Sequence, residues 1–502
     1  MKALVCCLFV IANISFHGKA SLDSISLTSA NVVLEDLTKF SDKSCYRPCK
    51  FNVKPKRCHY TFRIEPSILD DGKPGLTINE NRIPDQDLAM HWHGVDQKGS
   101  PYMDGVPMVT QCPIVSHQND GVYGSLVVNQ PQPLEPHSSL YDYDRSKEHS
   151  LLIGVKFPVL MTGNLEDMSH VAPESLLING DKENTKLFVM QGYSYRLRLI
   201  NAIAIECPVA VSIDQHEMIA IATDGRPVKP VTARSVQLYP GERMDVVVRA
   251  SQESGGYWVR VQGTGAGACA TVSANAMLLY SGFNYTSMLQ ENKHETHGDT
   301  SLSSVTLNGQ MMESLQDVTY TSEPKSVYLG IDRNLVNYKD DDIDFRYGIV
   351  QINSKSFLYP NAPILLKPEE VVADKVCNVG FGSNDSYTFH MHGLGMQIIA
   401  TGQRHDGLPL SKNQFLRLDQ EIKIARNTLN PPTKDTVTVP NKGYTIVRLR
   451  PERGSWLFEC RSCGLSSLPA AIIIQVQQTL PKAVVEALPK CGNYRPPDVL
   501  LN

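Results

Sequence analysis

The chain has 502 residues, of which 42% are hydrophobic and 20% are charged, and this ordinary globular composition excludes a wholly disordered or collagen-like chain. At about 150 residues per domain, the length predicts roughly three domains. The 48 basic and 52 acidic residues give a net charge of −4, so we expect no nucleic-acid partner.

The first 20 residues are typical of a secretory signal peptide. Lys2 precedes an apolar run over residues 3–14, and residues 18–20 (Gly-Lys-Ala) offer a cleavage site with small side chains. The apolar run is too short to cross a bilayer, and no later segment reaches 18 apolar residues, so we expect no membrane span. The sequence therefore predicts a secreted, extracellular protein that starts near Ser21. A buried N-terminal strand is the alternative interpretation of this run.

Cysteine usage agrees with secretion, because ten cysteines remain once the signal peptide is removed. An even number in a secreted chain favours disulfides, although spacing alone leaves their connectivity open. Sequons at Asn284 and Asn384 predict N-linked glycans in the same compartment. The ten are Cys45, Cys49, Cys58, Cys112, Cys207, Cys269, Cys377, Cys460, Cys463 and Cys491.

In chain order, short runs rich in Val, Ile, Leu and Tyr alternate with Gly, Pro, Asn and Asp, which is typical of β-sandwiches. We expect an all-β fold with no amphipathic helix longer than two turns. The units run over residues 51–135, 146–285 and 326–491, with a polar linker at 286–325. The first unit is shorter than the ~100 residues of a seven-stranded sandwich. The clearest predicted strands are 123–129, 195–201, 244–250, 257–263, 444–450 and 470–476.

Two His-x-His pairs, each followed by Gly, are the strongest candidates for metal ligands. The first lies in His-Trp-His-Gly at 91–94, and the second ends Tyr-Thr-Phe-His-Met-His-Gly at 387–393. Histidines at i and i+2 of an extended strand point to the same face, so both imidazoles can reach one metal. Either pair alone equally describes two surface histidines, whereas two pairs about 300 residues apart are far more specific. The candidate metal ligands are His91, His93, His390, His392 and Cys460.

Several longer stretches, considered together, resemble the multicopper oxidases, and specifically the insect-type laccases. They include HWHG, YMDGVPMVTQCPI at 102–114, DGVYGSLVV at 120–128, LLING at 176–180, ATDGRPVKPV at 222–231, PGERMDVVVRA at 240–250, PPTKDTVTVPNKGYTIVRLR at 431–450, WLFEC at 456–460 and LPKCGNYRP at 488–496.

This resemblance implies three cupredoxin-like Greek-key sandwiches, with the first and third shortened, and copper as the cofactor. It also implies that a type 1 copper takes single electrons from phenols or Fe(II), while a trinuclear type 2/type 3 cluster reduces dioxygen to water. It further implies a disulfide between Cys112 and Cys491, with Cys207–Cys269 as a second pair.

The sequence fills only part of the ligand set that the resemblance implies. His91 and His390 stand at type 2 positions, and His93 and His392 at type 3 positions. The family's second His-x-His motif is absent, and His117 lies too close to Asp120 to replace it. At the remaining ligand positions Glu459 and Arg461 replace type 3 histidines, Tyr387 and Leu465 replace type 1 histidines, and Ala470 replaces the axial Met.

Cys460 is the one type 1 ligand that remains, and a blue-copper site needs two histidines besides its thiolate. As a lone residue it is interpreted as a small buried side chain rather than as a redox partner of Cys463. Glu459 and Arg461 share the opposite strand face, where we expect them to form an ion pair in the vacated cavity.

These departures predict a secreted family member without copper-dependent oxidase activity, acting as an extracellular binding or structural protein for an unknown partner. We expect at most one residual mononuclear metal site among the four histidines, with Glu459 joining them. An active laccase or ferroxidase is the alternative. A shortened isoform or gene-model product is a third, because family strands are missing before residue 91, between 114 and 117, and between 377 and 387.

Overall fold

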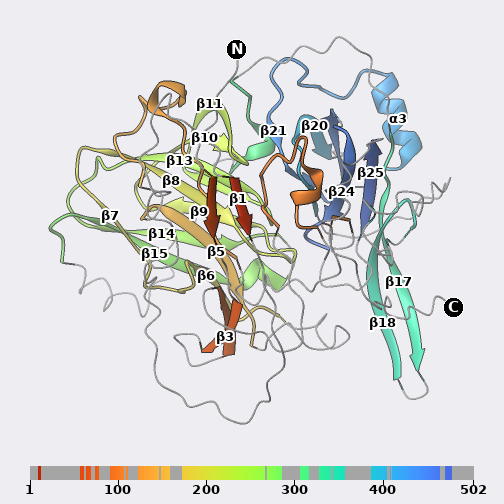
Figure 1. Ribbon diagram of the computed structural model, residues 1–502, viewed down its shortest axis with the longest axis horizontal. Coiled ribbons are helices and arrows are strands. Elements are labelled where there is room, and N and C mark those ends of the chain that lie inside the picture. The colour runs from red at the N-terminus through yellow and green to blue at the C-terminus, as the bar shows by residue number, and fades with distance from the viewer. Residues whose placement is uncertain are drawn as a thin grey trace.

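The computed structural model confirms the all-β prediction (Figure 1). It describes residues 9–12, 57–60, 64–68, 74–78, 91–106, 109–110, 123–145, 148–158, 172–265, 268–284, 306–315, 327–340, 343–355, 357, 364, 386–403, 408, 410–450, 452–463 and 470–476. Leu465, His117, Asn384 and the predicted disulfide Cys112–Cys491 lie outside these ranges.

Two six-stranded sheets pack face to face to form the middle sandwich, so called for its place in the sequence. In spatial order, one sheet contains β11 (Arg226–Ala233), β10 (Met218–Thr223), β13 (Arg243–Arg249), β8 (Ser194–Asn201), β5 (Ser150–Lys156) and β6 (Ser175–Ile178). The other contains β16 (Leu307–Asn308), β12 (Ser235–Leu238), β9 (Val209–Ile213), β14 (Gly256–Gly263), β15 (Ser273–Tyr280) and β7 (Lys186–Val189).

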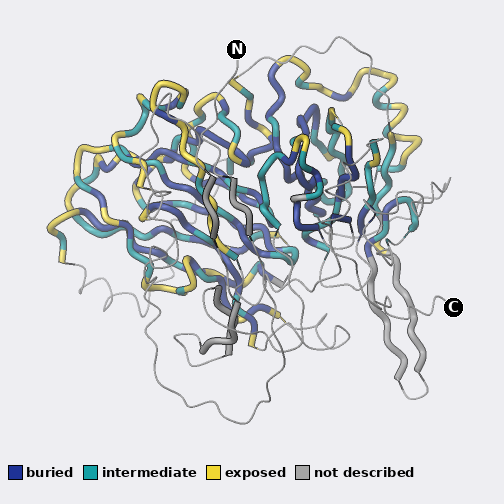
Figure 2. Tube along the Cα trace, in the orientation of Figure 1, coloured by how far each residue is buried: buried dark blue, intermediate teal, exposed yellow. Residues whose placement is uncertain are grey.

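Alternating apolar residues of both sheets form one buried cluster, as a sandwich core requires. Figure 2 colours much of these strands as buried. Val209, Val211 and Ile213 of β9, for example, point inward, while the residues between them are partly exposed. The predicted disulfide Cys207–Cys269 is present inside this core, with both cysteines fully buried. That prediction is therefore confirmed.

The C-terminal strands form a second apolar core. A four-stranded sheet contains β22 (Thr436–Val439), β19 (Tyr387–Met391), β24 (Gly454–Cys460) and β25 (Ala471–Val476), and a three-stranded sheet contains β21 (Thr433–Lys434), β20 (Met396–Gln403) and β23 (Gly443–Leu449). A hairpin of β17 (Ile331–Asp340) and β18 (Ile343–Ile352) projects beside them (Figure 1). Trp456 and Phe389, both almost fully buried, lie at the centre of this core.

In its described part, the N-terminal unit forms only two-stranded pairings. Strand β1 (Phe9–Ala12) runs parallel to β2 (Arg57–Tyr60), and β3 (Ile64–Ile68) pairs antiparallel with β4 (Pro74–Ile78). Since β1 lies within the predicted signal peptide, that segment is extended and paired in this full-length chain; its cleavage stays a prediction.

Residues 123–129 are irregular, so the strand expected there is absent. An apolar run becomes a strand only where a neighbouring strand completes its hydrogen bonds, and in the structure Leu126 and Val128 are more than half exposed.

Two further expectations need correction or refinement. Helix α3 (Lys412–Gln420) is longer than two turns, although no such helix was expected. A capping box between Ser411 and Gln414 begins it, and the sequence shows this signal as Ser-x-x-Gln.

The predicted linker 286–325 contains β16, which extends the middle sandwich by pairing with β12. The remaining domain boundaries stay predictions.

Buried charges join the middle sandwich to the C-terminal sheets. Lys434 Nζ lies 3.0 Å from an Asp224 carboxylate oxygen and 3.4 Å from a Glu242 carboxylate oxygen, and all three side chains are nearly or fully buried. Arg243 holds Asp435 through two hydrogen bonds of 2.5 and 2.6 Å. These contacts fix β13 of the middle sandwich against the segment Lys434–Thr436.

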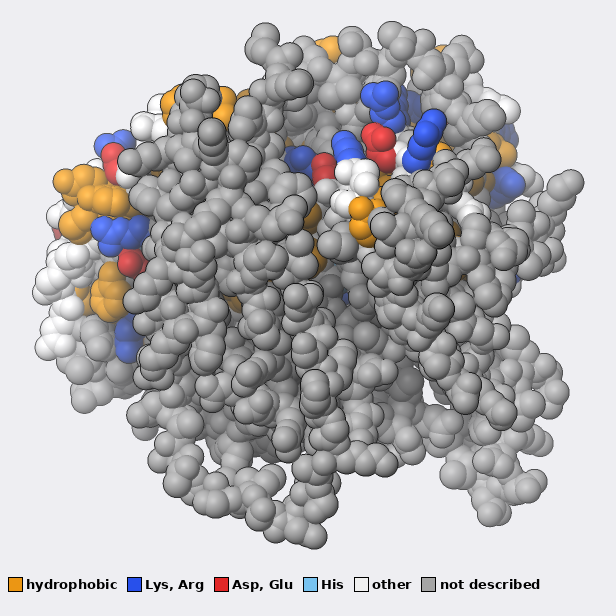
Figure 3. Space-filling model, in the orientation of Figure 1, with side chains coloured by type: hydrophobic (Ala, Val, Ile, Leu, Met, Phe, Trp, Pro, Cys, Tyr) orange, Lys and Arg blue, Asp and Glu red, His pale blue; other side chains and the backbone are white. Residues whose placement is uncertain are grey.

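The described surface mixes charges of both signs, with Lys and Arg beside Asp and Glu on the face shown in Figure 3. Among the described residues, no helix is long and apolar enough to span a membrane.

Candidate metal centre

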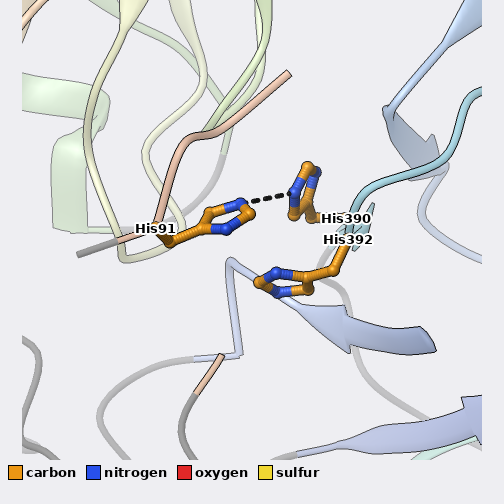
Figure 4. A group of neighbouring side chains, drawn as sticks. All are labelled: His91, His390 and His392. Atoms are coloured by element: carbon orange, nitrogen blue, oxygen red, sulfur yellow. Dashed lines mark hydrogen bonds between the residues drawn. The ribbon is translucent and has the colours of Figure 1, made fainter. Parts of the chain in front are cut away.

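The two His-x-His pairs converge at the boundary between the N-terminal segment and the C-terminal sheets. His390 lies in β19 and His392 follows its end, while His91 approaches from a separate segment (Figure 4). His93 belongs to the same segment as His91. Ring centroids are 5.2 Å apart for His91 and His390, and 4.2 Å apart for His91 and His392. His93 stacks on His390 at 3.8 Å.

The His91–His93 segment is irregular and turns at Gly94, so the strand expected there is absent. Gly94 adopts a φ of +89°, a left-handed conformation that glycine tolerates without strain. His93 and Gly94 both belong to this turn. Both rings nevertheless reach the same cluster.

His91 and His390 direct their Nε2 atoms at each other, 3.1 Å apart. The Nδ1 of His91 lies 2.8 Å from the backbone oxygen of Asp104, and the Nδ1 of His390 lies 3.1 Å from that of Asp435. A carbonyl oxygen can only accept, so each Nδ1 carries the hydrogen. Burial and the nearby charge of His93 hold the pKa of His390 well below its usual value. In neutral rings, therefore, two Nε2 lone pairs face each other, an arrangement that a shared cation would satisfy.

His93 has a different environment, because its Nε2 faces only oxygen atoms. Gly241 O lies at 3.0 Å, Thr436 Oγ1 at 3.1 Å and Asp435 Oδ1 at 3.3 Å. The Nε2 of His93 therefore carries a hydrogen. Arg243, paired with Asp435 through both guanidinium nitrogens, places a positive charge beside this ring.

His392 is enclosed by carboxylates. Its Nε2 lies 2.9 Å from Glu459 Oε1, and its Nδ1 lies 3.5 Å from Asp104 Oδ2. Burial alone would lower the pKa of His392, but the carboxylates of Glu459 and Asp104 raise it to about 9. The ion pair expected between Glu459 and Arg461 is present at 3.0 Å. His392 must therefore give up a proton before it can bind a metal.

Two groups of three side chains bring their ligand atoms within 4.8 Å of one another: His91, His390 and His392, and separately His93, His390 and Asp435. A metal ion bonds imidazole nitrogen at about 2.0–2.1 Å, so two nitrogens on one ion lie at most about 4.1 Å apart. The 3.1 Å between His91 Nε2 and His390 Nε2 meets this limit. In the second group Arg243 occupies both oxygens of Asp435, so the first group fits a metal better.

At the position where the resemblance implies type 1 copper, Cys460 is bonded to Cys463 in a disulfide with a Cα–Cα distance of 5.5 Å. This corrects the expectation that Cys460 is an isolated thiol, because its sulfur is no longer a thiolate that could bind copper. The spacing permits this closure since β24 ends at Cys460 and the chain turns directly afterwards. Tyr387 and Ala470 pack in the apolar core beside the disulfide.

Three charged residues of the centre were not predicted as site residues: Asp104, Asp435 and Arg243. Burial alone would raise the pKa of both carboxyls. His91 and His392 nevertheless bring the pKa of Asp104 below its usual value, and Arg243, with hydrogen bonds from His390 and His93, does the same for Asp435. Asp104 lies in the YMDG motif and Asp435 in PPTKDT, so an acidic residue inside an otherwise apolar or Thr-rich stretch was the available signal.

Family models described as multicopper oxidase match residues 75–123, 157–282 and 332–462, which together span more than half of the chain. Laccase-2 of Botryotinia fuckeliana is 26% identical, over 79% of this chain and 74% of its own length. Laccase-3 of Thanatephorus cucumeris is 34% identical, over 43% of this chain and 46% of its own length.

Among solved structures, Fet3p, titled a multicopper oxidase that functions in iron import, has a TM-score of 0.67 at 16% identity, covering 85% of this chain and 93% of its own. A laccase from Botrytis aclada has a TM-score of 0.58 at 22% identity, covering 80% of this chain and 81% of its own. These structures share the cupredoxin-like fold. The chain belongs to the multicopper oxidase family, whose cofactor is copper.

Proposed function

We propose that this protein is a secreted member of the family without copper-dependent oxidase activity, which keeps one mononuclear metal site and acts as an extracellular binding protein. The proposal concerns the site rather than the fold, because one fold hosts both active and inactive members. Its insect-type character stays a prediction.

The ligand set at the type 1 position, Cys460 together with Tyr387, is the single observation that carries this proposal. A type 1 centre needs a thiolate and two histidines, whereas here the sulfur is bonded to Cys463 and Tyr387 stands at a histidine position. Without that centre, electrons from a phenol or Fe(II) have no copper to enter by.

The type 3 positions support the same conclusion. Glu459 and Arg461 stand where the resemblance implies histidines, and they pair with each other and, through Glu459, with His392. A fixed guanidinium charge disfavours a second and third dication close by. The pair His91 and His390 remains suited to one ion.

A metal held by His91 and His390 would supply a Lewis-acidic centre with imidazole ligands, which suit Cu(II) or Zn(II). The backbone oxygens of Asp104 and Asp435 fix the tautomer of these two rings, as carbonyl groups behind metal-binding histidines commonly do. His392 completes the group once it loses its proton to solvent.

Oxygen uptake by the copper-loaded protein, with a diphenol or with Fe(II), tests the loss of activity. We expect no uptake above that of the Cys460→Ser variant and of free copper at the same concentration. Turnover that the Cys460→Ser substitution abolishes would restore the laccase or ferroxidase interpretation.

Secretion is tested separately by expressing the full chain in eukaryotic cells. We expect the medium to contain protein that starts near Ser21 and carries a glycan at Asn284, which is exposed in the structure. Full-length chain retained in the cytosol without a glycan would contradict this part of the proposal.

A further inference from the structure

The disulfide Cys460–Cys463 differs from the other described disulfide in burial and in the length of chain that it closes. Cys207 and Cys269 are fully buried and 62 residues apart. Cys460 and Cys463 are only three residues apart, and both are partly exposed. Cys207–Cys269 is therefore an enclosed disulfide with which the partly exposed disulfide Cys460–Cys463 can be compared in the same chain.

Exposure matters because thiol–disulfide exchange requires an incoming thiolate to reach a sulfur atom. The enclosed bond can be reached only after the middle sandwich opens, whereas Cys463 presents part of its surface in the folded protein. The short loop also makes Cys460–Cys463 the easier bond to reduce without unfolding the protein. A bond that closes a short loop removes less entropy from the unfolded chain, so the fold depends less on it.

Hydrogen bonds that do not involve the sulfur atoms hold the turn after β24 in place. The backbone N–H of Arg461 donates to Thr388 O at 2.7 Å, and the N–H of Thr388 donates to Ser462 Oγ at 2.8 Å. Thr388 and Ser462 are both buried, and Thr388 belongs to the central strand β19. These bonds survive cleavage of the disulfide and keep the two cysteines close enough for it to form again.

The hydroxyl of Ser462 also lies 3.8 Å from Cys460 Sγ. Its oxygen accepts from Thr388, so its hydrogen is available to the sulfur. A hydroxyl donor at this place stabilises the thiolate that leaves when the bond is cleaved, because a hydrogen bond to an ionised acceptor is stronger than one to a neutral acceptor.

We propose that Cys460–Cys463 is a reversible dithiol–disulfide site that exchanges two electrons with external dithiols. A thiolate of the dithiol attacks Cys463 Sγ, the bond to Cys460 breaks, and Cys460 leaves as a thiolate. The second thiol of the reductant then attacks the mixed disulfide and releases Cys463. The dithiol ends as a cyclic disulfide, the protein gains two electrons and two protons, and an external disulfide reverses the sequence.

The test treats the native protein with dithiothreitol under anaerobic conditions, alkylates free thiols after increasing times, and identifies the modified peptides by mass spectrometry. We expect Cys460 and Cys463 to be alkylated at least about tenfold faster than Cys207 and Cys269, while the circular dichroism spectrum is unchanged. Oxidised dithiothreitol should restore the bond. A variant with Cys460→Ser and Cys463→Ser should lose this rapid phase and keep the slow labelling of the enclosed pair.

Three outcomes would overturn the proposal. The two disulfides open together and only as the fold is lost, Cys460–Cys463 resists reduction as long as the enclosed bond does, or both thiols are already free in protein purified without reductant. Because labelling is read peptide by peptide, cysteines elsewhere in the chain do not affect the result.

Discussion

His93 and His392 are each linked through a carboxylate to an arginine. His93 contacts Asp435, which Arg243 holds, and His392 contacts Glu459, which Arg461 holds. These two groups flank the pair His91 and His390, whose Nε2 atoms have no carboxylate of their own within the described contacts. Charge neutralisation on both sides explains how four imidazoles and two guanidinium groups lie together in a buried region.

Replacing Glu459 by Gln tests whether this carboxylate holds the C-terminal part of the centre. The variant leaves Arg461 without its carboxylate partner and His392 with only Asp104, at 3.5 Å, and breaking a buried ion pair typically costs about 3–5 kcal/mol. We expect the free energy of unfolding, measured with denaturant, to fall by about 3 kcal/mol.

Glu217→Gln is the matched control, because Glu217 pairs with Arg234 at 3.7 Å on the surface, with both side chains more than half exposed. Exposed pairs contribute about 0–1 kcal/mol, so this variant should be nearly neutral. Equal losses in the two variants would show that the Glu459 contacts do not stabilise the protein.

At this scale the sequence predicted that the two His pairs meet and that Glu459 pairs with Arg461. Strand alternation applies to Glu459 and to His390, whereas the strand expected at His91–His93 is absent. Asp435 and Arg243 were not predicted as site residues, since they lie 192 positions apart and meet only when two domains pack. Cys460 was predicted to be an isolated thiol, whereas the structure bonds it to Cys463. A turn that begins directly after Cys460 brings the two sulfur atoms together.

Among the elements, four strands were predicted well: β8, β13 and β14 have partners on both sides, and β25 pairs with β24 at the edge of its sheet. Residues 195–201, 244–250, 257–263 and 470–476 coincide with β8, β13, β14 and β25 to within one residue at each end. The predicted strand at 123–129 failed, because apolar alternation describes a side-chain face and says nothing about whether a neighbouring strand exists to pair with it.

The turn between β9 and β10 carries a histidine whose neutral form the fold specifies. His216 Nδ1 lies 2.7 Å from Asp214 O and therefore donates, and His216 Nε2 lies 2.8 Å from the Tyr280 hydroxyl. That hydroxyl accepts from the backbone N–H of Gln252, so its hydrogen points to His216. A second proton on the ring would lose this bond, and burial lowers the pKa of His216.

Because the pKa of His216 is lower in the folded protein than in the unfolded chain, its stabilising contribution is complete above about pH 6.5 and is lost as the pH falls further. We expect the free energy of unfolding to decrease from pH 7.5 to pH 5.5, and to decrease less steeply in His216→Gln. His149, whose pKa burial also lowers, is present in both proteins, so the difference isolates His216. Parallel pH profiles would contradict the assignment.

On the scale of the whole molecule, the buried Lys434 joins two sheets that belong to different sandwiches. It lies between Asp224 and Glu242, and desolvation opposes these carboxylates, which nevertheless raise the pKa of Lys434. The candidate metal centre begins one residue later, at Asp435. The geometry of the centre therefore depends on how firmly the two sandwiches are held.

Lys434→Met keeps the side-chain volume and removes the charge. We expect a loss of about 3 kcal/mol in the free energy of unfolding, because Glu242 then remains buried without its cation and Asp224 keeps only Arg243, at 3.5 Å. Lys182→Met, at an exposed pair with Glu183, is the control and should change stability by less than about 1 kcal/mol. A nearly neutral Lys434→Met would show that the buried network does not stabilise the interface.

The metal content of the secreted protein, purified after growth with added copper and zinc, tests the central claim most directly. We predict one ion per chain, which is lost when His91 and His390 are both replaced by Ala. The control Glu217→Gln, at a side chain that is more than half exposed, should retain it. A full copper complement, with a type 1, a type 2 and two type 3 ions and the blue colour of a copper thiolate, would contradict the account.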